Sequence, residues 1–241
     1  KMAAIYLIRH GEASFGAGAY DQLSEKGCEQ ACILGASWQK RLGEEQVYSG
    51  SLSRHIQTVE YFQKGAKNRD TPITIHSGFN EFDHVDVLKN YHEQWSDFSK
   101  VTAHFAKQGQ ADKKLQKEFS LALAQWISCK EEGQYNELWP AFKDRCIAAL
   151  HEVINQYLES KRQREPSTGS KDIVIFTSGG TISILIQHVL GLSDQQAIAI
   201  SQQLRNTSVS KLLFCENRLS VDYFNNFSHL TKAGEDWITF R

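Results

Sequence analysis

Short apolar runs alternate with amphipathic stretches along the first third of the chain. Residues 3–8 form an apolar run that is typical of a buried strand, and shorter strands are predicted at 47–49 and 73–75. We expect helices between these strands, one over 24–42, whose first serine is a good N-cap, and one over 53–64. Alternation of strand and helix predicts a mainly parallel sheet covered by helices.

The pattern changes to a purely helical one after about residue 82. From 85 to 164 the chain has one proline and little strand character, and apolar residues recur every three or four positions. These positions are Leu115, Phe119, Leu123, Trp126, Ile127, Phe142, Cys146, Ala149, Leu150, Val153, Ile154 and Tyr157. The spacing predicts a block of helices of roughly 80 residues, followed by a polar connector over 161–171.

The strand and helix scheme then resumes. Residues 172–177 form a strong buried-strand signal that ends in Ser-Gly-Gly-Thr at 178–181, and a helix is predicted over 182–190. Two further strands are predicted at 209–215 and 219–224, with Asn217 and Arg218 in the turn between them.

Because the same scheme stands on both sides of the helical block, we predict one domain rather than two in tandem. Its core, residues 1–84 and 171–241, is expected to be a three-layer α/β/α fold with a central, mostly parallel sheet. Residues 85–170 or so are then a helical insertion that acts as a cap.

Composition narrows the class of protein without naming it. Hydrophobic residues make up 41% and charged residues 23%, as is ordinary for a globular protein, and a net charge of −1 argues against nucleic-acid binding. No run of about 20 apolar residues is present, so we expect no membrane span. The five cysteines are scattered, which favours reduced thiols and a cytoplasmic protein without signal peptide.

Candidate chemistry is concentrated in four polar segments that follow predicted strands. They are Arg-His-Gly-Glu at 9–12, 49–54 with Arg54, 79–84, and the glycine-rich 178–181. In open α/β folds such segments meet at the carboxyl edge of the sheet. Arginine forks and a glycine-rich helix start both bind anions, and histidine is a nucleophile or proton carrier near neutral pH. The sequence therefore predicts a site for a phosphate-like group.

These segments resemble motifs of the histidine phosphatase superfamily, the phosphoglycerate-mutase-like proteins. The tetrapeptide at 9–12 and the second-arginine segment at 51–58 are similar to its two arginine motifs. Residues 21–27 resemble its Asp-x-Leu-Thr-x-x-Gly helix start, and 205–208 its late Asn-x-Ser segment. The matches occur in family order at the two ends of the chain, and no motif covers the helical middle.

The resemblance implies a mechanism and a set of site residues. His10 would attack a phosphoryl group and carry it as phosphohistidine, while Arg9 and Arg54 would bind its oxygens. Glu81 would protonate the leaving oxygen, with the nearby Asp83 as the alternative donor. No metal or other cofactor is implied, because the arginines supply the positive charge.

The chain departs from the family at one position. The family has a second histidine, as His-Gly-Gly, where this chain has Ser178, followed by Gly179. The resemblance makes both of them phosphate-binding. A serine can donate a hydrogen bond but cannot become a cation, so we expect either a phosphatase helped by His84 or His55, or a weakened site.

Three further residues are expected to support the site. Glu12, Ser14 and Asn206 either contact the ligand or shape its loops. The predicted function is hydrolysis of a phosphomonoester, either a small molecule or a phosphopeptide. A catalytically weak or inactive protein that binds phosphorylated ligands is the alternative, and a mutase is a third reading. The substrate and the oligomeric state are not determined by the sequence.

Overall fold

The structure is a computed structural model that describes residues 2–14, 21–38, 46–68, 70–95, 111–163 and 172–240. The chain divides into two compact units. The first comprises Lys1–Ser14, Ala19–Glu81 and Arg145–Arg241, and the second is built around Phe82–Asp144. That residues 85–170 form a cap on a single domain stays a prediction. None of the described helices is both long enough and apolar enough to cross a membrane.

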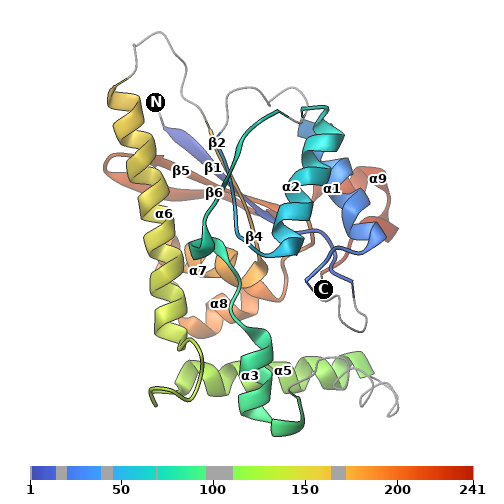
Figure 1. Ribbon diagram of the computed structural model, residues 1–241, viewed down its shortest axis with the longest axis vertical. Coiled ribbons are helices and arrows are strands. Elements are labelled where there is room, and N and C mark those ends of the chain that lie inside the picture. Colours follow the sequence, from blue (N-terminus) through green and yellow to red (C-terminus); the bar gives the residue numbers. More distant parts are fainter. Residues whose placement is uncertain are drawn as a thin grey trace. The chain divides into compact units, whose positions relative to one another are not determined.

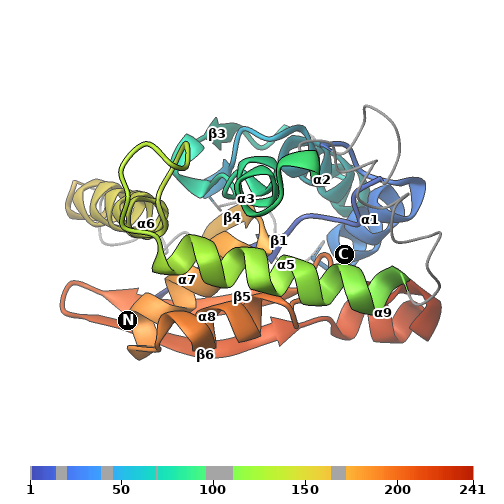
Figure 2. The ribbon, with the colours of Figure 1, turned by 90° about the horizontal axis from the view of Figure 1, so that it is seen from below.

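In the described part of the chain, six strands form one mixed sheet in the order β3-β2-β4-β1-β5-β6. The strands are β1 (Ala3–Arg9), β2 (Gln46–Ser49), β3 (Ile73–Ile75), β4 (Ile173–Thr177), β5 (Val209–Cys215) and β6 (Arg218–Asn226). The first four strands are parallel to one another, β5 is antiparallel to its neighbour β1, and β6 is antiparallel to β5. The strands β3 and β6 lie at opposite edges (Figure 2). The predicted mostly parallel α/β fold is confirmed.

The helices match the predicted ones with some changes. They are α1 (Glu25–Trp38), α2 (Ser53–Ala66), α3 (His84–Tyr91), α5 (Ala111–Ser128), α6 (Trp139–Arg162), α7 (Gly179–Leu190), α8 (Asp194–Ser201) and α9 (Ser228–Ala233), with 3-10 turns η1 (Ser77–Phe79), η2 (Glu93–Trp95) and η3 (Glu235–Trp237). The predicted helix over 182–190 was wrong in its start, because the extended Ser178 is the N-cap and both glycines are already helical. Residues 39–42 and most of the predicted connector lie outside the described residues.

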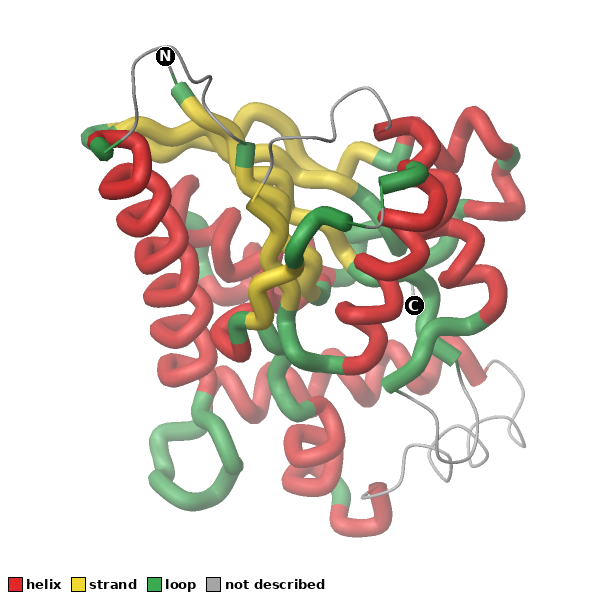
Figure 3. The backbone as a smooth tube through the Cα atoms, turned by 45° about the horizontal axis from the view of Figure 1, so that its top comes forward, coloured by secondary structure: helices red, strands yellow, loops and turns green. Residues whose placement is uncertain are grey.

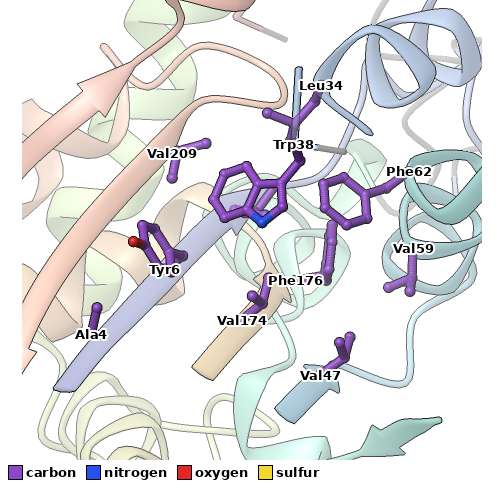
Figure 4. Packing of buried hydrophobic residues seen from close by; sticks show 11 residues of the cluster. Ala4, Tyr6, Leu34, Trp38, Val47, Val59, Phe62, Val174, Phe176 and Val209 are labelled. Atoms are coloured by element: carbon purple, nitrogen blue, oxygen red, sulfur yellow. The ribbon is translucent and has the colours of Figure 1, made fainter. Parts of the chain in front are cut away.

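One face of the sheet is covered by α1 and α2. Alternate side chains of β1, among them Tyr6, point to this face and pack with residues of both helices and of β2, β4 and β5 (Figure 4). Trp38 makes edge contacts with Tyr6 at 4.9 Å and with Phe62 at 5.9 Å between ring centroids, and Phe62 also packs on Phe176 at 5.1 Å. This aromatic cluster fixes the two helices on the sheet.

The opposite face is covered by α6 and α7, so that the sheet is the middle of three layers (Figures 1 and 3). Phe214 of β5 points to this side and its ring meets that of Tyr157 in α6, with centroids 5.0 Å apart. A Cβ on Gly78 of η1 would come within 2.5 Å of the Cβ of Ala149, so only glycine allows this close approach of η1 to α6.

The second unit has an aromatic core of its own. Trp126 lies between Phe82, Trp139 and Phe142, with ring centroids at 4.8, 5.2 and 5.8 Å. Its indole N–H donates to the carbonyl oxygen of Glu137 at 2.8 Å, which satisfies the polar atom of this buried side chain.

Candidate active site

His10 follows the last residue of β1 and is held by backbone hydrogen bonds on both sides. Its N–H donates to the carbonyl oxygen of Thr177 at 2.9 Å, and its own carbonyl accepts from the Asn206 side-chain amide at 3.1 Å. The next N–H, that of Gly11, donates to the hydroxyl of Thr58 at 3.1 Å. The nucleophile predicted from the sequence is therefore fixed to β4, α2 and the segment before β5.

The imidazole of His10 is buried, with 6% of the residue exposed. Burial is the main reason why its pKa lies well below the ordinary value, and the charges of Arg54 and Arg9 lower the pKa further. Its Nδ1 lies 2.7 Å from the carbonyl oxygen of Gly11. Because a carbonyl only accepts, we assign the single proton to Nδ1, which leaves the lone pair of Nε2 for attack.

The two predicted arginines flank this loop and are both nearly buried. Nη1 of Arg9 donates to the carbonyl oxygen of Leu204. Nη1 of Arg54 donates to Oδ1 of Asp21 at 2.8 Å, and the other oxygen of that carboxylate accepts from the N–H of Ser53 at 2.9 Å. Both guanidinium groups are close enough to His10 to lower the pKa of its imidazole.

The glycine-rich segment after β4 starts helix α7 and meets Glu81. The N–H of Gly180 donates to Oε2 of Glu81 at 2.9 Å, so the carboxylate lies at the positive end of the helix. A Cβ on Gly180 would come within 2.2 Å of Oε1, so the contact requires glycine. A Cβ on Gly179 would lie 3.6 Å from Nε of Arg9, which brings this residue beside the first arginine.

Ser178, where the sequence resemblance leads us to expect a histidine, is fully buried. Its hydroxyl oxygen lies 2.6 Å from Nε2 of His55, a residue that follows the second arginine directly. The imidazole rings of His55 and His10 are 5.9 Å apart between centroids. The structure thus brings His55, one of the two helpers expected from the sequence, to Ser178.

Asp83 and His84 belong to the second unit. The carboxylate of Asp83 caps α3, since Oδ1 accepts from the N–H groups of Val85 and Asp86 at 3.1 Å each. This cap gives Asp83 a structural task, whereas the carboxylate of Glu81 faces the start of α7 in the first unit. His84 is the first residue of α3, and a role for it at the site stays a prediction.

The remaining predicted residues all hold loops. Glu12 accepts a hydrogen bond from the hydroxyl of Ser24 at 3.0 Å, and that hydroxyl in turn caps α1 by accepting from the N–H of Gly27 at 3.0 Å. The hydroxyl of Ser14 donates to the carbonyl oxygen of Gln22 at 3.2 Å. Asn206 is fully buried, with its amide on the backbone of His10.

Two residues with clear tasks were not among the predicted site residues. Asp21 orients Arg54, and Thr58 links the loop after β1 to α2 by accepting from Gly11 and donating to the carbonyl of Arg54 at 2.6 Å. Both lie inside the segments that carried the resemblance. The signal was therefore present in the sequence, but neither partner could be identified from spacing alone.

Buried histidines also make the fold sensitive to acid. Burial lowers the pKa of His229 to about 4, from 6.5 in the unfolded chain. Between these values the unfolded state takes up a proton that the folded state does not, so stability is lost as the pH falls. We expect the free energy of unfolding to drop by about 3 kcal/mol from this residue alone.

Urea unfolding at pH 7 and pH 4.5 checks this expectation. The matched variant is His229→Gln, because glutamine does not titrate and can still bond with the hydroxyl of Thr207, 3.0 Å from the imidazole. The variant should lose distinctly less stability over this range than the wild type. Equal losses in the two proteins would show that His229 does not carry this dependence.

Among the described residues, no group of three or more histidine, cysteine, aspartate or glutamate side chains is arranged to hold a metal ion.

Comparison with known proteins identifies the family to which the chain belongs. The family model of the histidine phosphatase superfamily (branch 1) matches residues 5–113 and 103–227. No match was found among curated protein sequences.

Solved structures share the fold at low sequence identity. A phosphoglycerate mutase from Bacillus anthracis is 17% identical, with 98% of each chain covered and a TM-score of 0.64. The mycobacterial glucosyl-3-phosphoglycerate phosphatase is 17% identical over 93% of this chain and 99% of its own, with a TM-score of 0.61. A phosphoserine phosphatase variant from Entamoeba histolytica, in complex with phosphoserine, is 19% identical over 94% and 98%, with a TM-score of 0.59.

The family model covers most of the chain, and its two matched segments include Arg9, His10, Arg54 and Ser178. The central sheet and its flanking helices agree with the fold of the similar structures. The chain belongs to the histidine phosphatase superfamily, branch 1.

Proposed function

We propose that this protein is a phosphomonoester hydrolase that acts through a phosphohistidine on His10. The observation that carries the proposal is the setting of His10: the ring is buried, its Nδ1 lies 2.7 Å from the carbonyl oxygen of Gly11, and two arginines lie near enough to lower its pKa. A neutral imidazole with a free Nε2 lone pair is a nucleophile. Similar structures include two phosphatases, which agrees with this choice.

In the first step, Nε2 of His10 attacks phosphorus and forms a P–N bond, while the bond to the ester oxygen breaks. Negative charge on the transferring group is stabilised by Arg9 and Arg54. The leaving oxygen receives a proton from Glu81, which lies at the start of α7 on the N–H of Gly180. The products of this step are the free alcohol and phosphohistidine.

In the second step, water attacks the phosphohistidine. Glu81, now a carboxylate, accepts a proton from the attacking water, and the P–N bond breaks to release phosphate and regenerate neutral His10. The Nδ1 proton of His10 stays on the ring in both steps and is donated to the carbonyl oxygen of Gly11, so the ring keeps one orientation. Phosphorylated small molecules and phosphorylated peptides are both proposed as substrate classes.

The function is tested by measuring phosphate release from a panel of phosphomonoesters. The panel contains an aryl phosphate, alkyl phosphates such as phosphoserine, and phosphorylated peptides. We expect the wild type to turn over at least one class. Binding of these compounds without release of phosphate would contradict the proposal and favour a protein that only binds phosphorylated ligands.

If Glu81 is the proton donor, the loss of kcat on its replacement should depend on the leaving group of the substrate. Glu81→Gln keeps an oxygen that accepts from Gly180 but cannot supply a proton. We expect kcat on an alkyl phosphate to fall by about 10²-fold, and kcat on an aryl phosphate to fall less, because an aryl leaving group needs less protonation. Steady-state kinetics on both substrates check this prediction.

The comparison variant for Glu81 is Asp83→Asn, which preserves a residue that caps α3 well. It should leave the ratio of alkyl to aryl turnover as in the wild type. The reverse pattern, with the ratio changed in Asp83→Asn alone, would identify Asp83 as the proton donor and contradict the assignment of Glu81.

A further inference from the structure

A buried hydrogen bond joins His55 in α2 to Ser178 at the start of α7. The two side chains are 123 positions apart in the sequence, and both are fully excluded from solvent. Nε2 of His55 lies 2.6 Å from Oγ of Ser178, and the mechanism above assigns no role to either group. A buried polar atom without a hydrogen-bond partner costs free energy, so the proton on the His55 ring and the hydroxyl proton of Ser178 each need an acceptor.

The proton on His55 can be placed from its surroundings. Burial, with a smaller contribution from Arg54, lowers the pKa of His55 well below its ordinary value, so the ring carries one proton. Nδ1 has no hydrogen-bond partner among the described residues and packs against Gly50, where a Cβ would come within 2.2 Å. A buried N–H without acceptor is rarer than a buried acceptor without donor. The proton therefore lies on Nε2 and is donated to Ser178.

This assignment leaves the hydroxyl proton of Ser178 available. The hydroxyl oxygen accepts from His55 and caps no N–H of α7, and in the described part of the chain it makes no other side-chain hydrogen bond. Ser178 also lies beside the nucleophile, because Arg9 is paired with Thr177 in the sheet and His10 donates to the Thr177 carbonyl. Since no acceptor for this proton is found among the residues that the structure describes, a group bound at His10 would be its acceptor.

We propose that His55 is a positioning residue, which holds Ser178 so that its hydroxyl donates to the phosphoryl group on His10. The inference rests on the proposed function and deepens it. The imidazole expected at position 178 is supplied from α2 instead, and the serine carries its hydrogen bond to the phosphoryl group. A histidine at 178 would have to occupy the space that the ring of His55 fills.

A double-mutant cycle tests whether His55 acts through Ser178. Ser178→Ala removes one oxygen and should lower kcat for the wild type's best substrate by on the order of 10²-fold, with little change in KM. His55→Ala should lower kcat to a similar extent. The double variant should be no more than about threefold slower than the slower single variant, because both changes remove one and the same interaction.

Conservative replacement separates positioning from packing. His55→Gln retains an N–H donor and should recover at least about tenfold of the kcat lost in His55→Ala. Ser178→His in the wild-type background should lower activity, since two imidazoles compete for one space, and Ser178→His with His55→Ala should be faster than Ser178→His alone. His151→Ala, an exposed histidine of α6, is the control and should match the wild type.

The outcomes are distinct. Thermal unfolding first checks that Ser178→Ala, a small change, is folded. If the folded variant retains the wild-type kcat, the inference is overturned and the proposed function stands. Independent, multiplying losses in the double variant, or a rise in activity of Ser178→His alone, also overturn it. If the wild type releases no phosphate from any compound of the panel, the proposed function fails, and this inference fails with it.

Discussion

Replacing His10 by alanine should reduce phosphate release by on the order of 10⁴-fold or more, the largest effect of any substitution in this chain. The reason is chemical, because the proposed mechanism assigns the attack on phosphorus to Nε2 of His10, whereas Nε2 of the neighbouring His55 is engaged with Ser178 and its Nδ1 packs against Gly50. KM is not the informative parameter here, since the arginines that bind the phosphoryl group are untouched. Steady-state release of phosphate from an aryl phosphate, measured at a raised enzyme concentration for the variant but with substrate still in excess, checks the result.

The loss should not come from unfolding. The backbone of residue 10 is held by the carbonyl of Thr177 and the amide of Asn206, and neither bond involves the imidazole. The thermal unfolding midpoint of His10→Ala should therefore stay close to that of the wild type, and removal of a buried imidazole of low pKa should make the variant less sensitive to acid. Turnover that survives in a folded His10→Ala variant would exclude His10 as the nucleophile.

Replacing Arg54 by alanine should lower kcat/KM by about 10²- to 10³-fold, the second largest effect. The guanidinium group is nearly buried, its Nη1 donates to Asp21, and a planar arginine fork matches the geometry of phosphoryl oxygens. Arg54→Lys keeps the charge and loses the fork, so its activity should lie between those of the alanine variant and the wild type. Because Asp21 is 44% exposed, its carboxylate returns to solvent and stability should change little.

Arg54→Ala has a second readout in the pH profile. Arg54 lowers the pKa of His10, so its removal raises that pKa. His10 attacks only when unprotonated, and kcat/KM therefore falls as the pH drops through its pKa. The acid limb of the profile should move to higher pH in Arg54→Ala and remain near the wild-type position in Arg54→Lys. An acid limb that does not move would mean that Arg54 lies too far from His10 to act on it.

Much of the fold could be predicted because its elements have strong local patterns. The apolar runs that became β1 and β4 are buried on both faces, and such strands are continuous in hydrophobicity. Helix α8 was missed although Ser193 and Gln196 form a complete capping box, a signal that is visible in the sequence. Helix α9 has six residues, too few for a periodic pattern.

The segments that form the candidate site could be predicted from the sequence, but the hydrogen bonds between side chains of distant segments could not. Each predicted strand is followed by a polar segment that is visible in the sequence. Because ligand sites lie at the carboxyl ends of parallel strands, these segments could be predicted to meet at one edge of the sheet. Sequence alone left open whether Glu81 or Asp83 is the donor, since they are two positions apart. It also named His55 only as a possible helper, because its bond to Ser178 depends on how α2 and α7 meet at that edge.

The most direct measurement is the position of phosphate on the protein during turnover. The enzyme is mixed with an aryl phosphate, whose leaving group needs little protonation by Glu81 in the first step. The reaction is quenched in alkaline denaturant, in which phosphohistidine survives, and the peptides are analysed by mass spectrometry. We predict phosphate on His10, at higher occupancy in Glu81→Gln, where the attack of water is slowed. Continuing turnover with phosphate on another residue, or with none on residue 10 in either protein, would contradict the account.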